Sequence, residues 1–311
     1  MKKILVIGGN GFIGTNVVQY LVQKKYLVGV YDLSSGSEKG VEYYEGNIND
    51  DPNFERILSQ YDTIIYLLSA IMPQMSMEDP LSSYQTDIPL LLIVLEACKK
   101  NNIKRVIYAS SGGTVYGDSN IPNQEDKVTN PINHYAICKL TCEKILCLYN
   151  SLYNMENVIL RIANPYGIGQ RLESGVGAVT IFTKSIISYS KIRIYGDGEN
   201  IRDYIDVRDV AKMFECAIRW AYEKQVPPIF NVGSGKGYSL LQLIEIISNE
   251  LGIKAIVEFV PRREFDIKCS ILDMSKTKSF FHFECEQDSE SSIRQYVRLL
   301  KKRYSGSDFI L

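Results

Sequence analysis

Short apolar runs and longer amphipathic stretches alternate along the first half of the chain. The apolar runs are rich in valine and isoleucine, which is typical of strands buried on both faces of a parallel sheet. The stretches between them place apolar residues at helical spacing. The expected strands are 4–7, 27–31, 63–68, 106–110 and 158–162, and the expected helices are 13–22, 89–100 and 135–149. Strands that alternate with helices predict an α/β fold with a doubly wound parallel sheet.

The pattern changes at about residue 164, where glycine and proline begin to interrupt shorter elements. Such a segment predicts a smaller, mixed α/β domain that is built around a ligand. A helix is expected at 207–222, and the strand expected at 229–232 is predicted to return to the first sheet. The expected domains are 1–165, with a return segment at about 203–233, and 166–311.

Composition and charge exclude several classes of protein. Hydrophobic residues make up 45% of the 311 residues and charged residues 23%, which is ordinary for a globular chain and excludes disorder or a coiled coil. The net charge of −1 provides no basic surface for nucleic acid or an anionic membrane. No apolar run approaches the roughly 20 residues that cross a bilayer. We therefore expect neither a nucleic-acid partner nor a membrane.

Cysteine and histidine usage indicates the compartment and argues against a metal site. The seven cysteines are odd in number and scattered, so reduced thiols in the cytoplasm are expected. Cys138, Cys142 and Cys147 lie near one another on one expected helix, but small buried thiols are common in protein cores. Since the chain has only two histidines, we expect no metal ion.

A glycine-rich segment follows the first strand directly and opens the first helix. It has the spacing G-x-G-x-x-G at Gly9, Gly11 and Gly14, with a further glycine at Gly8. Glycines allow the backbone to approach a pyrophosphate closely, and the helix N-terminus contributes positive partial charge. Asp32 ends the second strand, where its carboxylate can accept hydrogen bonds from ribose hydroxyls and repels a 2′-phosphate. The sequence therefore predicts a Rossmann-like domain that binds NAD rather than NADP.

Tyr135 and Lys139 lie one helical turn apart in an expected helix, so their side chains share one face. A free tyrosine titrates near pH 10, and a neighbouring ammonium group favours its deprotonated form. The pair follows a segment rich in hydroxyl groups and glycine, 110–117, which continues from the strand at 106–110. This arrangement predicts a tyrosine that acts as a general base.

Six further segments extend these motifs into a resemblance that covers residues 8 to about 276. The segments are Gly46–Asp50, Tyr66–Ser69, Leu160–Gly167, Tyr195–Tyr204, Asn231–Gly235 and Pro261–Asp266. Together with the glycine-rich segment and the Tyr–Lys pair, they resemble the extended short-chain dehydrogenase/reductases, in the group of nucleoside-diphosphate-sugar epimerases and dehydratases. Several positions depart from the pattern of that group. Ile7 replaces a threonine, Asn47 an aspartate and Phe265 a glycine, and the segment Tyr66–Ser69 stands where H-x-A-A is usual.

The resemblance implies an activity and a role for each matching residue. It implies an NAD-dependent enzyme that epimerises a UDP-hexose or a UDP-N-acetylhexosamine at C4 through a transient 4-keto intermediate, with residues 166–311 binding the nucleotide sugar. Tyr135 would remove the proton of the sugar 4-hydroxyl, and Lys139 would hold the nicotinamide ribose. The hydroxyl-bearing position of the group falls on Gly112 here, so Thr114 or Ser111 is expected to polarise the 4-oxygen, with Thr114 preferred.

The resemblance also assigns two sets of binding residues. The expected cofactor-binding residues are Gly8, Gly11, Phe12, Ile13, Gly14, Asp32, Asn47, Ile48, Leu67, Ser69, Tyr135 and Lys139. The expected substrate-binding residues are Thr114, Asn164, Arg202, Arg263, Asp266 and Ser270.

Departures from the group's pattern indicate which of the group's reactions and substrates to expect. Dehydratases carry an Asp–Glu pair at the positions of Gly113 and Thr114, so dehydration is not expected. Ser270 replaces a residue whose bulk limits the substituent at sugar C2; it predicts acceptance of N-acetylhexosamines, unless it is an ordinary strand residue. Two alternative functions stay open: an NAD(P)H-dependent reductase of a nucleoside-diphosphate 4-keto sugar, and a non-catalytic NAD-binding protein. A homodimer formed by helices 83–100 and 135–149 is implied by the resemblance alone.

Overall fold

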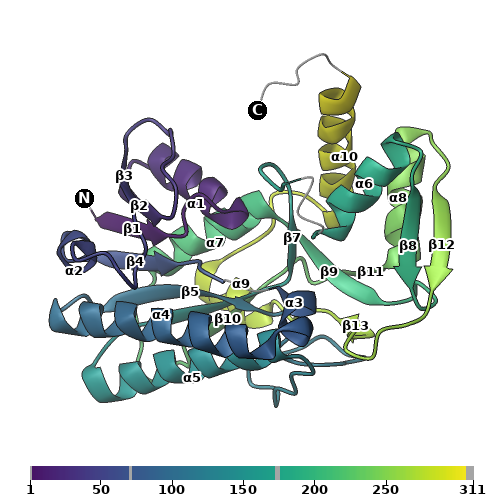
Figure 1. The fold of residues 1–311 in the computed structure, drawn as a ribbon. Coiled ribbons are helices and arrows are strands. Elements are labelled where there is room, and N and C mark those ends of the chain that lie inside the picture. Colours follow the sequence, from purple (N-terminus) through teal and green to yellow (C-terminus); the bar gives the residue numbers. More distant parts are fainter. Residues whose placement is uncertain (1, 70–71, 172–175, 306–311) are drawn as a thin grey trace.

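The computed structural model describes residues 2–69, 72–171 and 176–305, and its largest sheet has seven parallel strands (Figure 1). The strands are β1 (Lys3–Ile7), β2 (Leu27–Asp32), β3 (Val41–Glu45), β4 (Thr63–Tyr66), β5 (Arg105–Ser111), β6 (Val158–Ile162) and β10 (Ile229–Val232). Their order is β10-β6-β5-β4-β1-β2-β3, and every neighbouring pair is parallel. The order changes direction between β1 and β4, where such sheets have a crevice at their carboxyl edge. The predicted doubly wound, Rossmann-like fold is confirmed.

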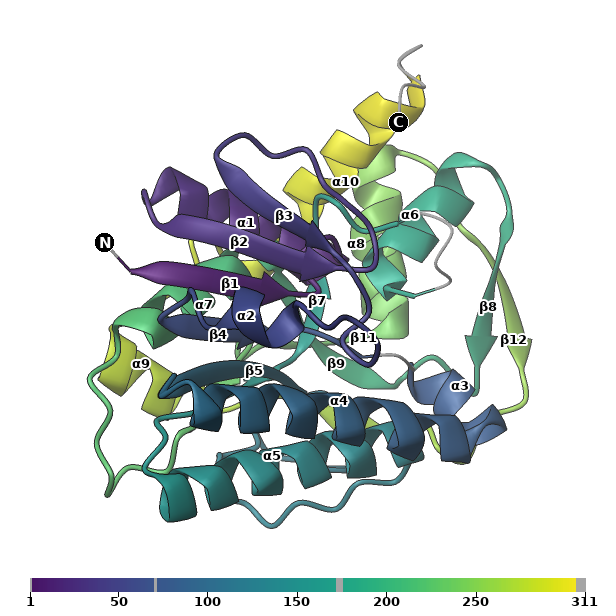
Figure 2. The same ribbon diagram turned by 60° about the vertical axis from the view of Figure 1, so that its left-hand side comes forward.

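Helices cover both faces of this sheet (Figure 2). The helices are α1 (Phe12–Gln23), α7 (Val207–Arg219) and α9 (Ser275–Phe281) on one face, and α2 (Phe54–Leu58), α4 (Pro80–Lys100) and α5 (His134–Tyr153) on the other. Along β1, Ile4 and Val6 belong to the apolar cluster of the first face, whereas Leu5 and Ile7 belong to that of the second. The continuous apolar runs in the sequence therefore arise from strands that are buried on both faces.

The helix expected at 89–100 is longer than predicted, because α4 begins at Pro80. Its N-cap residue, Asp79, accepts a hydrogen bond from the Ser82 backbone N–H (3.2 Å), and a proline in the first turn has no N–H to satisfy. The helix then continues through Pro89, so the expected start at that proline was wrong, whereas the range 83–100 expected for the dimer helix lies within α4. A short helix, α3 (Pro73–Glu78), precedes α4 and packs against α4 and α5.

The second half of the chain forms smaller sheets and a separate helical layer. β7 (Asn164–Tyr166), β9 (Ile201–Asp206), β11 (Gly237–Ser239) and β13 (Cys269–Ser270) make a mixed sheet, and β8 (Lys191–Tyr195) pairs with β12 (Ile256–Val260). The helices α6 (Ala178–Ile187), α8 (Leu240–Leu251) and α10 (Ser289–Ser305) share their own apolar cluster. The predicted mixed α/β second half is thus confirmed, while the domain boundaries at 165 and 166 stay a prediction.

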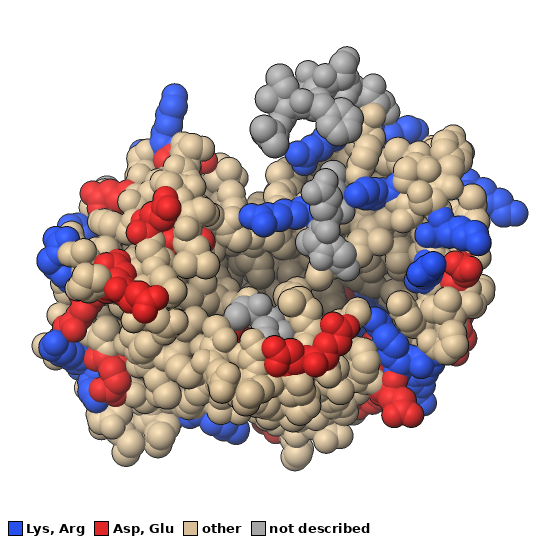
Figure 3. All heavy atoms as spheres, in the orientation of Figure 1, with Lys and Arg blue, Asp and Glu red and all other residues tan. Residues whose placement is uncertain are grey.

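The surface is hollowed between the two halves, and lysine and arginine side chains lie near the rim of this hollow (Figure 3). In the described part of the chain, no helix is both long and apolar enough to span a membrane. Over the same residues, no group of three or more His, Cys, Asp or Glu side chains could hold a metal ion. All seven cysteines are free thiols.

Candidate active site

The glycine-rich segment forms a tight turn between β1 and α1. Gly8 has a φ of +81°, which glycine adopts without strain, and its N–H donates to the Tyr31 carbonyl on β2 (2.9 Å). A Cβ atom at Gly14 would lie 2.4 Å from the Gly8 carbonyl oxygen, so only glycine fits there. The first turn of α1, with Phe12 and Ile13, has backbone N–H groups without intrahelical partners. Such a turn is suited to the pyrophosphate of a dinucleotide.

Asp32 lies beside this turn at the end of β2. Its carboxylate accepts hydrogen bonds from the backbone N–H groups of Asn10 (2.9 Å) and Leu33 (2.8 Å). Its carbonyl accepts from the Gly46 N–H (3.0 Å), which brings the segment after β3 to the same place. A half-buried carboxylate fixed next to the glycine turn is suited to the ribose hydroxyls of NAD.

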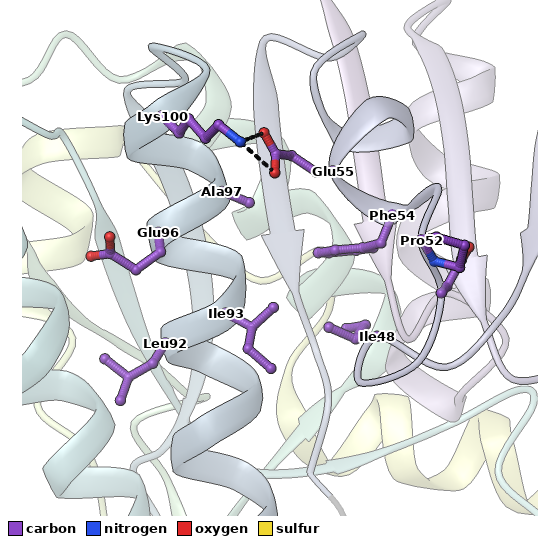
Figure 4. Close-up of a pocket in the computed structure, with 10 residues that line it drawn as sticks. Ile48, Pro52, Phe54, Glu55, Leu92, Ile93, Glu96, Ala97 and Lys100 are labelled. Carbon is purple, nitrogen blue, oxygen red and sulfur yellow. Dashed lines mark hydrogen bonds and ion pairs between the residues drawn. The ribbon is translucent and has the colours of Figure 1, made fainter.

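Asn47 and Ile48 follow in the segment after β3. Asn47 is exposed, and its Oδ1 accepts from the Asn49 N–H (3.1 Å), which stabilises the local turn. Ile48 is buried and lines a hollow of about 590 Å³ between α2 and α4 (Figure 4). The Lys100 ammonium and the Glu55 carboxylate form an ion pair in the same hollow (2.8 Å). Because Glu45 at the end of β3 pairs with Asp32, Asn47 and Ile48 follow β3 at the end of the sheet where Asp32 lies.

The loop after β4 passes directly beside the glycine turn. The Leu67 N–H donates to the Ile7 carbonyl (3.0 Å), and a Cβ atom on Gly8 would lie 3.4 Å from the Leu67 carbonyl carbon. Ser69 lies further along this loop, and its hydroxyl donates to the buried Asp87 of α4 (3.1 Å). The structure thus places Leu67 at the glycine turn and ties Ser69 to α4.

Tyr135 and Lys139 share one face of α5, next to the end of β5. Lys139 is only 3% exposed, and its Nζ donates to the Ala109 carbonyl (3.2 Å). The same ammonium lies 5.0 Å from the ring centroid of Tyr108 and 5.7 Å from that of Tyr135. A buried positive charge is therefore held beside the tyrosine that was predicted as the base.

Ser111 ends β5 and Thr114 lies in the turn that follows; the segment 111–114 is hereafter the hydroxyl turn, and these two side chains bond to each other. The Thr114 Oγ1 donates to the Ser111 Oγ (2.8 Å), so the two candidate hydroxyls form one unit. A Cβ atom at Gly112 would lie 2.8 Å from the Arg161 carbonyl oxygen and 2.7 Å from the Leu272 Cδ1. No hydroxyl-bearing side chain fits at position 112 without a shift of the surrounding chain.

Asn164 and Ser270 approach the hydroxyl turn from the second half. A Cβ atom on Gly113 would lie 3.4 Å from the Asn164 Nδ2, which donates to the Asp203 carbonyl (2.9 Å). Ser270 is 2% exposed, and its Oγ donates to the Gly112 carbonyl (3.4 Å). The structure therefore brings two of the expected substrate residues to the edge of the sheet where Tyr135 lies.

The expected phosphate and ribose ligands lie around the segment before β13. The Arg202 guanidinium donates to the carbonyls of Ile267 (2.5 Å) and Lys268 (3.5 Å), and burial lowers its pKa. Arg263 and Asp266 form a bidentate ion pair, with Nε–Oδ2 and Nη2–Oδ1 distances of 2.9 and 3.1 Å. The residues expected to contact phosphate and ribose separately thus also contact each other.

Comparison with known proteins identifies the family to which this arrangement belongs. The model of the NAD dependent epimerase/dehydratase family matches residues 4–233, which include the glycine turn, the Tyr–Lys pair and Arg202. The chain belongs to this family. The predicted enzyme class, an NAD-dependent epimerase, is confirmed, and so is NAD as its cofactor.

Three solved structures are similar to this epimerase/dehydratase family member over nearly its whole length. UDP-glucose 4-epimerase from Thermotoga maritima, solved with UDP-glucose, is 32% identical, with a TM-score of 0.90 over 97% of this chain and 99% of that chain. The Thermus thermophilus UDP-glucose 4-epimerase, in complex with NAD, is 27% identical, with a TM-score of 0.88 over 96% and 99%. UDP-N-acetylglucosamine 4-epimerase from Methanobrevibacter ruminantium M1, in complex with UDP-N-acetylmuramic acid, is 31% identical, with a TM-score of 0.88 over 97% and 99%.

Sequence reasoning about this family member did not single out Asp203 or Ser76. Asp203 is 1% exposed and accepts from the N–H and Oγ of Ser234 (2.8 and 2.7 Å) and from the Gly235 N–H (3.1 Å). Burial raises its pKa to about 6, although these hydrogen bonds act in the opposite direction. Asp203 directly follows Arg202 in the segment Tyr195–Tyr204, so the resemblance could have pointed to this residue. Ser76 contacts a residue 59 positions away, so no local signal could have found it.

Proposed function

We propose that this epimerase/dehydratase family member epimerises a UDP-hexose or a UDP-N-acetylhexosamine at C4. The observation that carries the proposal is the buried Lys139 beside Tyr135, at the end of the sheet that also holds the glycine turn and Asp32. Support comes from the relatives that are named as 4-epimerases, two of which were solved with UDP-linked sugars. A nucleotide sugar is therefore the proposed substrate class.

Tyr135 is the general base in this mechanism. Its phenolate oxygen takes the proton of the sugar 4-hydroxyl. Before that transfer, the Lys139 ammonium stabilises the negative charge on the phenolate. NAD, which the glycine turn and Asp32 would hold, would supply the hydride transfer at C4 of the sugar. Tyr135 gives its proton back to the 4-oxygen in the return step, so the protein is unchanged after each turnover.

Ser111 and Thr114 act together on the 4-oxygen in this proposal. The sequence favoured Thr114 and kept Ser111 as the alternative. Because Thr114 donates its hydroxyl hydrogen to the Ser111 Oγ (2.8 Å), the hydrogen of Ser111 is left to donate to the sugar. We therefore assign the direct contact to Ser111 and the orientation of that hydroxyl to Thr114.

Ser270 is proposed to set the range of sugars that the site accepts. Its small side chain is buried against the Gly112 carbonyl, directly below the hydroxyl turn. A tyrosine at this position would need the space that a substituent at sugar C2 requires. Ser270→Tyr is expected to abolish turnover of UDP-N-acetylglucosamine and to retain turnover of UDP-glucose. Equal loss on both sugars would remove this assignment.

A homodimer and a cytoplasmic location complete the proposal. α4 and α5 lie side by side on the outside of the sheet (Figure 2), and they expose Ile93 (37%), Leu148 (52%) and Leu152 (61%). Exposed apolar patches of this kind are typical of contact surfaces between proteins. The seven free cysteines are suited to a reducing compartment, which is the basis for the cytoplasmic location.

The function is tested by proton NMR of the anomeric signals of UDP-glucose and UDP-N-acetylglucosamine, incubated with the purified protein and a trace of NAD without reductant. New galacto-configured signals are the expected result, and they also identify the preferred sugar. Unchanged spectra from protein that is shown to bind NAD would favour the reductase of a nucleoside-diphosphate 4-keto sugar. Full biological activity of a Tyr135→Phe variant would instead favour a non-catalytic NAD-binding protein.

A further inference from the structure

The short helix α3 holds the main chain at the catalytic tyrosine. Ser76 is fully buried, and its Oγ accepts from the Tyr135 backbone N–H (3.1 Å) while donating to the Pro73 carbonyl (2.7 Å). Tyr135 lies in the first turn of α5, where backbone N–H groups have no acceptor within the helix. The Asn133 side chain serves the next such group, the Ala136 N–H (2.8 Å). Ser76 is therefore part of what fixes the start of α5.

The same helix also contacts the substrate half. Residues two apart in a helix point to nearly opposite sides, so Gln74 extends away from Ser76. The Gln74 Oε1 accepts from the Arg263 Nη1 (3.2 Å), across 189 positions of sequence. Figure 1 shows α3 at the end of the sheet where β13 also lies. One helix of six residues thus lies between a residue expected to bind phosphate and the predicted base.

Arg263 is held in place without using all of its donors. A guanidinium has five N–H donors. Asp266 accepts from Nε and Nη2 (2.9 and 3.1 Å), Gln74 accepts from Nη1 (3.2 Å), and the guanidinium carbon lies 4.0 Å from the Tyr195 ring centroid. In the described part of the chain, these contacts leave two N–H groups for oxygens of a diphosphate.

We propose that α3 couples the diphosphate subsite to the catalytic base, with Gln74 and Ser76 as positioning residues. The inference rests on the proposed function. A diphosphate bound to the two remaining N–H groups immobilises Arg263, which stabilises its contact with Gln74 and so the placement of α3. Ser76 then holds the backbone of Tyr135 in the position needed for proton transfer. Binding energy from the non-reacting part of the substrate is thereby used at the reacting carbon.

Hydrogen–deuterium exchange with UDP tests this coupling without catalysis, because UDP has no sugar to convert. In the wild-type protein, UDP is expected to slow exchange of the Tyr135 amide by about three- to tenfold, as for one stabilised hydrogen bond. In Gln74→Ala, UDP should still bind through Arg202 and Arg263, but this protection should be lost. Met75→Ala is the matched control, because Met75 lies between the two positioning residues and is 53% exposed. Equal protection in Gln74→Ala and the control would overturn the proposal.

Steady-state kinetics give a second, independent test. Gln74→Ala and Ser76→Ala are each expected to lower kcat by about three- to tenfold, with little change in KM. Ser76→Thr keeps the hydroxyl acceptor and should recover most of the rate, which a general packing role of Ser76 would not explain. A raised KM with an unchanged kcat would overturn the coupling and make Gln74 a simple binding residue.

Failure of the proposed function is distinguishable from failure of the coupling. If the wild-type protein does not bind UDP, the nucleotide-sugar assignment is wrong, and the inference is overturned with it. If it binds UDP but converts neither sugar, the epimerase assignment is wrong, whereas the exchange experiment still decides whether α3 links Arg263 to Tyr135.

Discussion

At the scale of single residues, the active site depends on positions where the chain has no side chain. Gly14 allows the close approach that shapes the glycine turn. Gly112 and Gly113 are adjacent, yet the first faces the Arg161 carbonyl and the second faces the Asn164 side chain. The first glycine is therefore required for packing, whereas the second one lies beside Asn164, which was predicted to bind the substrate.

This difference predicts opposite tolerance to serine at the two positions. Gly112→Ser is expected to lower the free energy of unfolding by about 1–3 kcal/mol, because its Cβ would lie 2.8 Å from a main-chain oxygen. Gly113→Ser should leave stability close to that of the wild type, since its Cβ would lie 3.4 Å from the Asn164 Nδ2. Urea unfolding of both variants is the measurement, and similar losses would contradict this description of the turn.

The hydroxyl pair predicts non-additive kinetics. Ser111→Ala is expected to lower kcat by about tenfold or more, because the variant loses the hydroxyl that we propose as the donor to the 4-oxygen. Thr114→Ala should have a similar effect, since Thr114 orients Ser111, and the double variant should be little worse than either single variant. If the Thr114 variant is clearly the slower, the direct contact belongs to Thr114. Independent, multiplicative effects would show that the hydroxyls do not act as one unit.

At the scale of elements, local signals predicted the parts of the fold and of the site that depend on neighbouring residues. The glycine turn, Asp32 and the Tyr–Lys pair are each contained in one strand, turn or helix, and the structure has these elements where they were expected. β3 (Val41–Glu45) was missed because it is an edge strand without a fully buried residue, and its exposed Glu42 and Glu45 interrupt any apolar run. α8 was missed although Ser239 and Gln242 form a capping box at its start.

Contacts between elements could not be predicted from the sequence. The contact of Gly112 with Ser270 joins residues 158 positions apart, and that of Gln74 with Arg263 joins residues 189 positions apart. Such pairs depend on how the two halves pack against each other, and this packing cannot be predicted from local periodicity or from a motif. The departure at α4 has a different cause, because Asp79 and Pro80 form a local start signal that the prediction did not use.

The exposed face of α4 and α5 makes a prediction about assembly. Leu148→Lys places a charge in the proposed dimer interface, where its desolvation is costly, so the variant is expected to be monomeric. Leu299→Lys is the matched control, because Leu299 is 41% exposed on α10, far from that face. Sedimentation of the wild type and both variants is the measurement. A monomeric wild type would contradict the proposed homodimer.

At the scale of the whole molecule, two buried carboxylates lie where the halves meet. Asp203 on β9 holds the turn after β10, and Asp209 on α7 accepts from the Glu286 N–H that precedes α10 (3.0 Å). Burial raises the pKa of each carboxyl to about 6. The folded state therefore binds these protons more tightly than the unfolded state does, whose carboxyl pKa is near 3.8.

These shifts predict stability that decreases as the pH rises. The contribution of Asp209 to the free energy of unfolding is complete below about pH 4 and is lost as the pH rises through about 6. The free energy of unfolding changes by at most about 3 kcal/mol for this reason. Asp209→Asn keeps an acceptor for the Glu286 N–H but cannot titrate. The stability of the variant relative to the wild type should therefore increase between pH 4 and pH 7. Asp288→Asn is the control, because an ion pair with Lys236 lowers the pKa of Asp288. The measurement is denaturant unfolding at pH 4 and pH 7. If the free energy of unfolding changes equally with pH in the wild type and in Asp209→Asn, the raised pKa of Asp209 is contradicted.

The return of β10 to the first sheet has a consequence for how the protein is made. β10 pairs with β6 at Ile229 and Ile159, so the last strand of the sheet is synthesised long after its neighbour. Until it leaves the ribosome, β6 is an unpaired edge whose free N–H and C=O groups can recruit strands from other chains. The nascent protein is therefore most exposed to aggregation while residues 163–228 are being translated, and completion of the sheet coincides with synthesis of the substrate half.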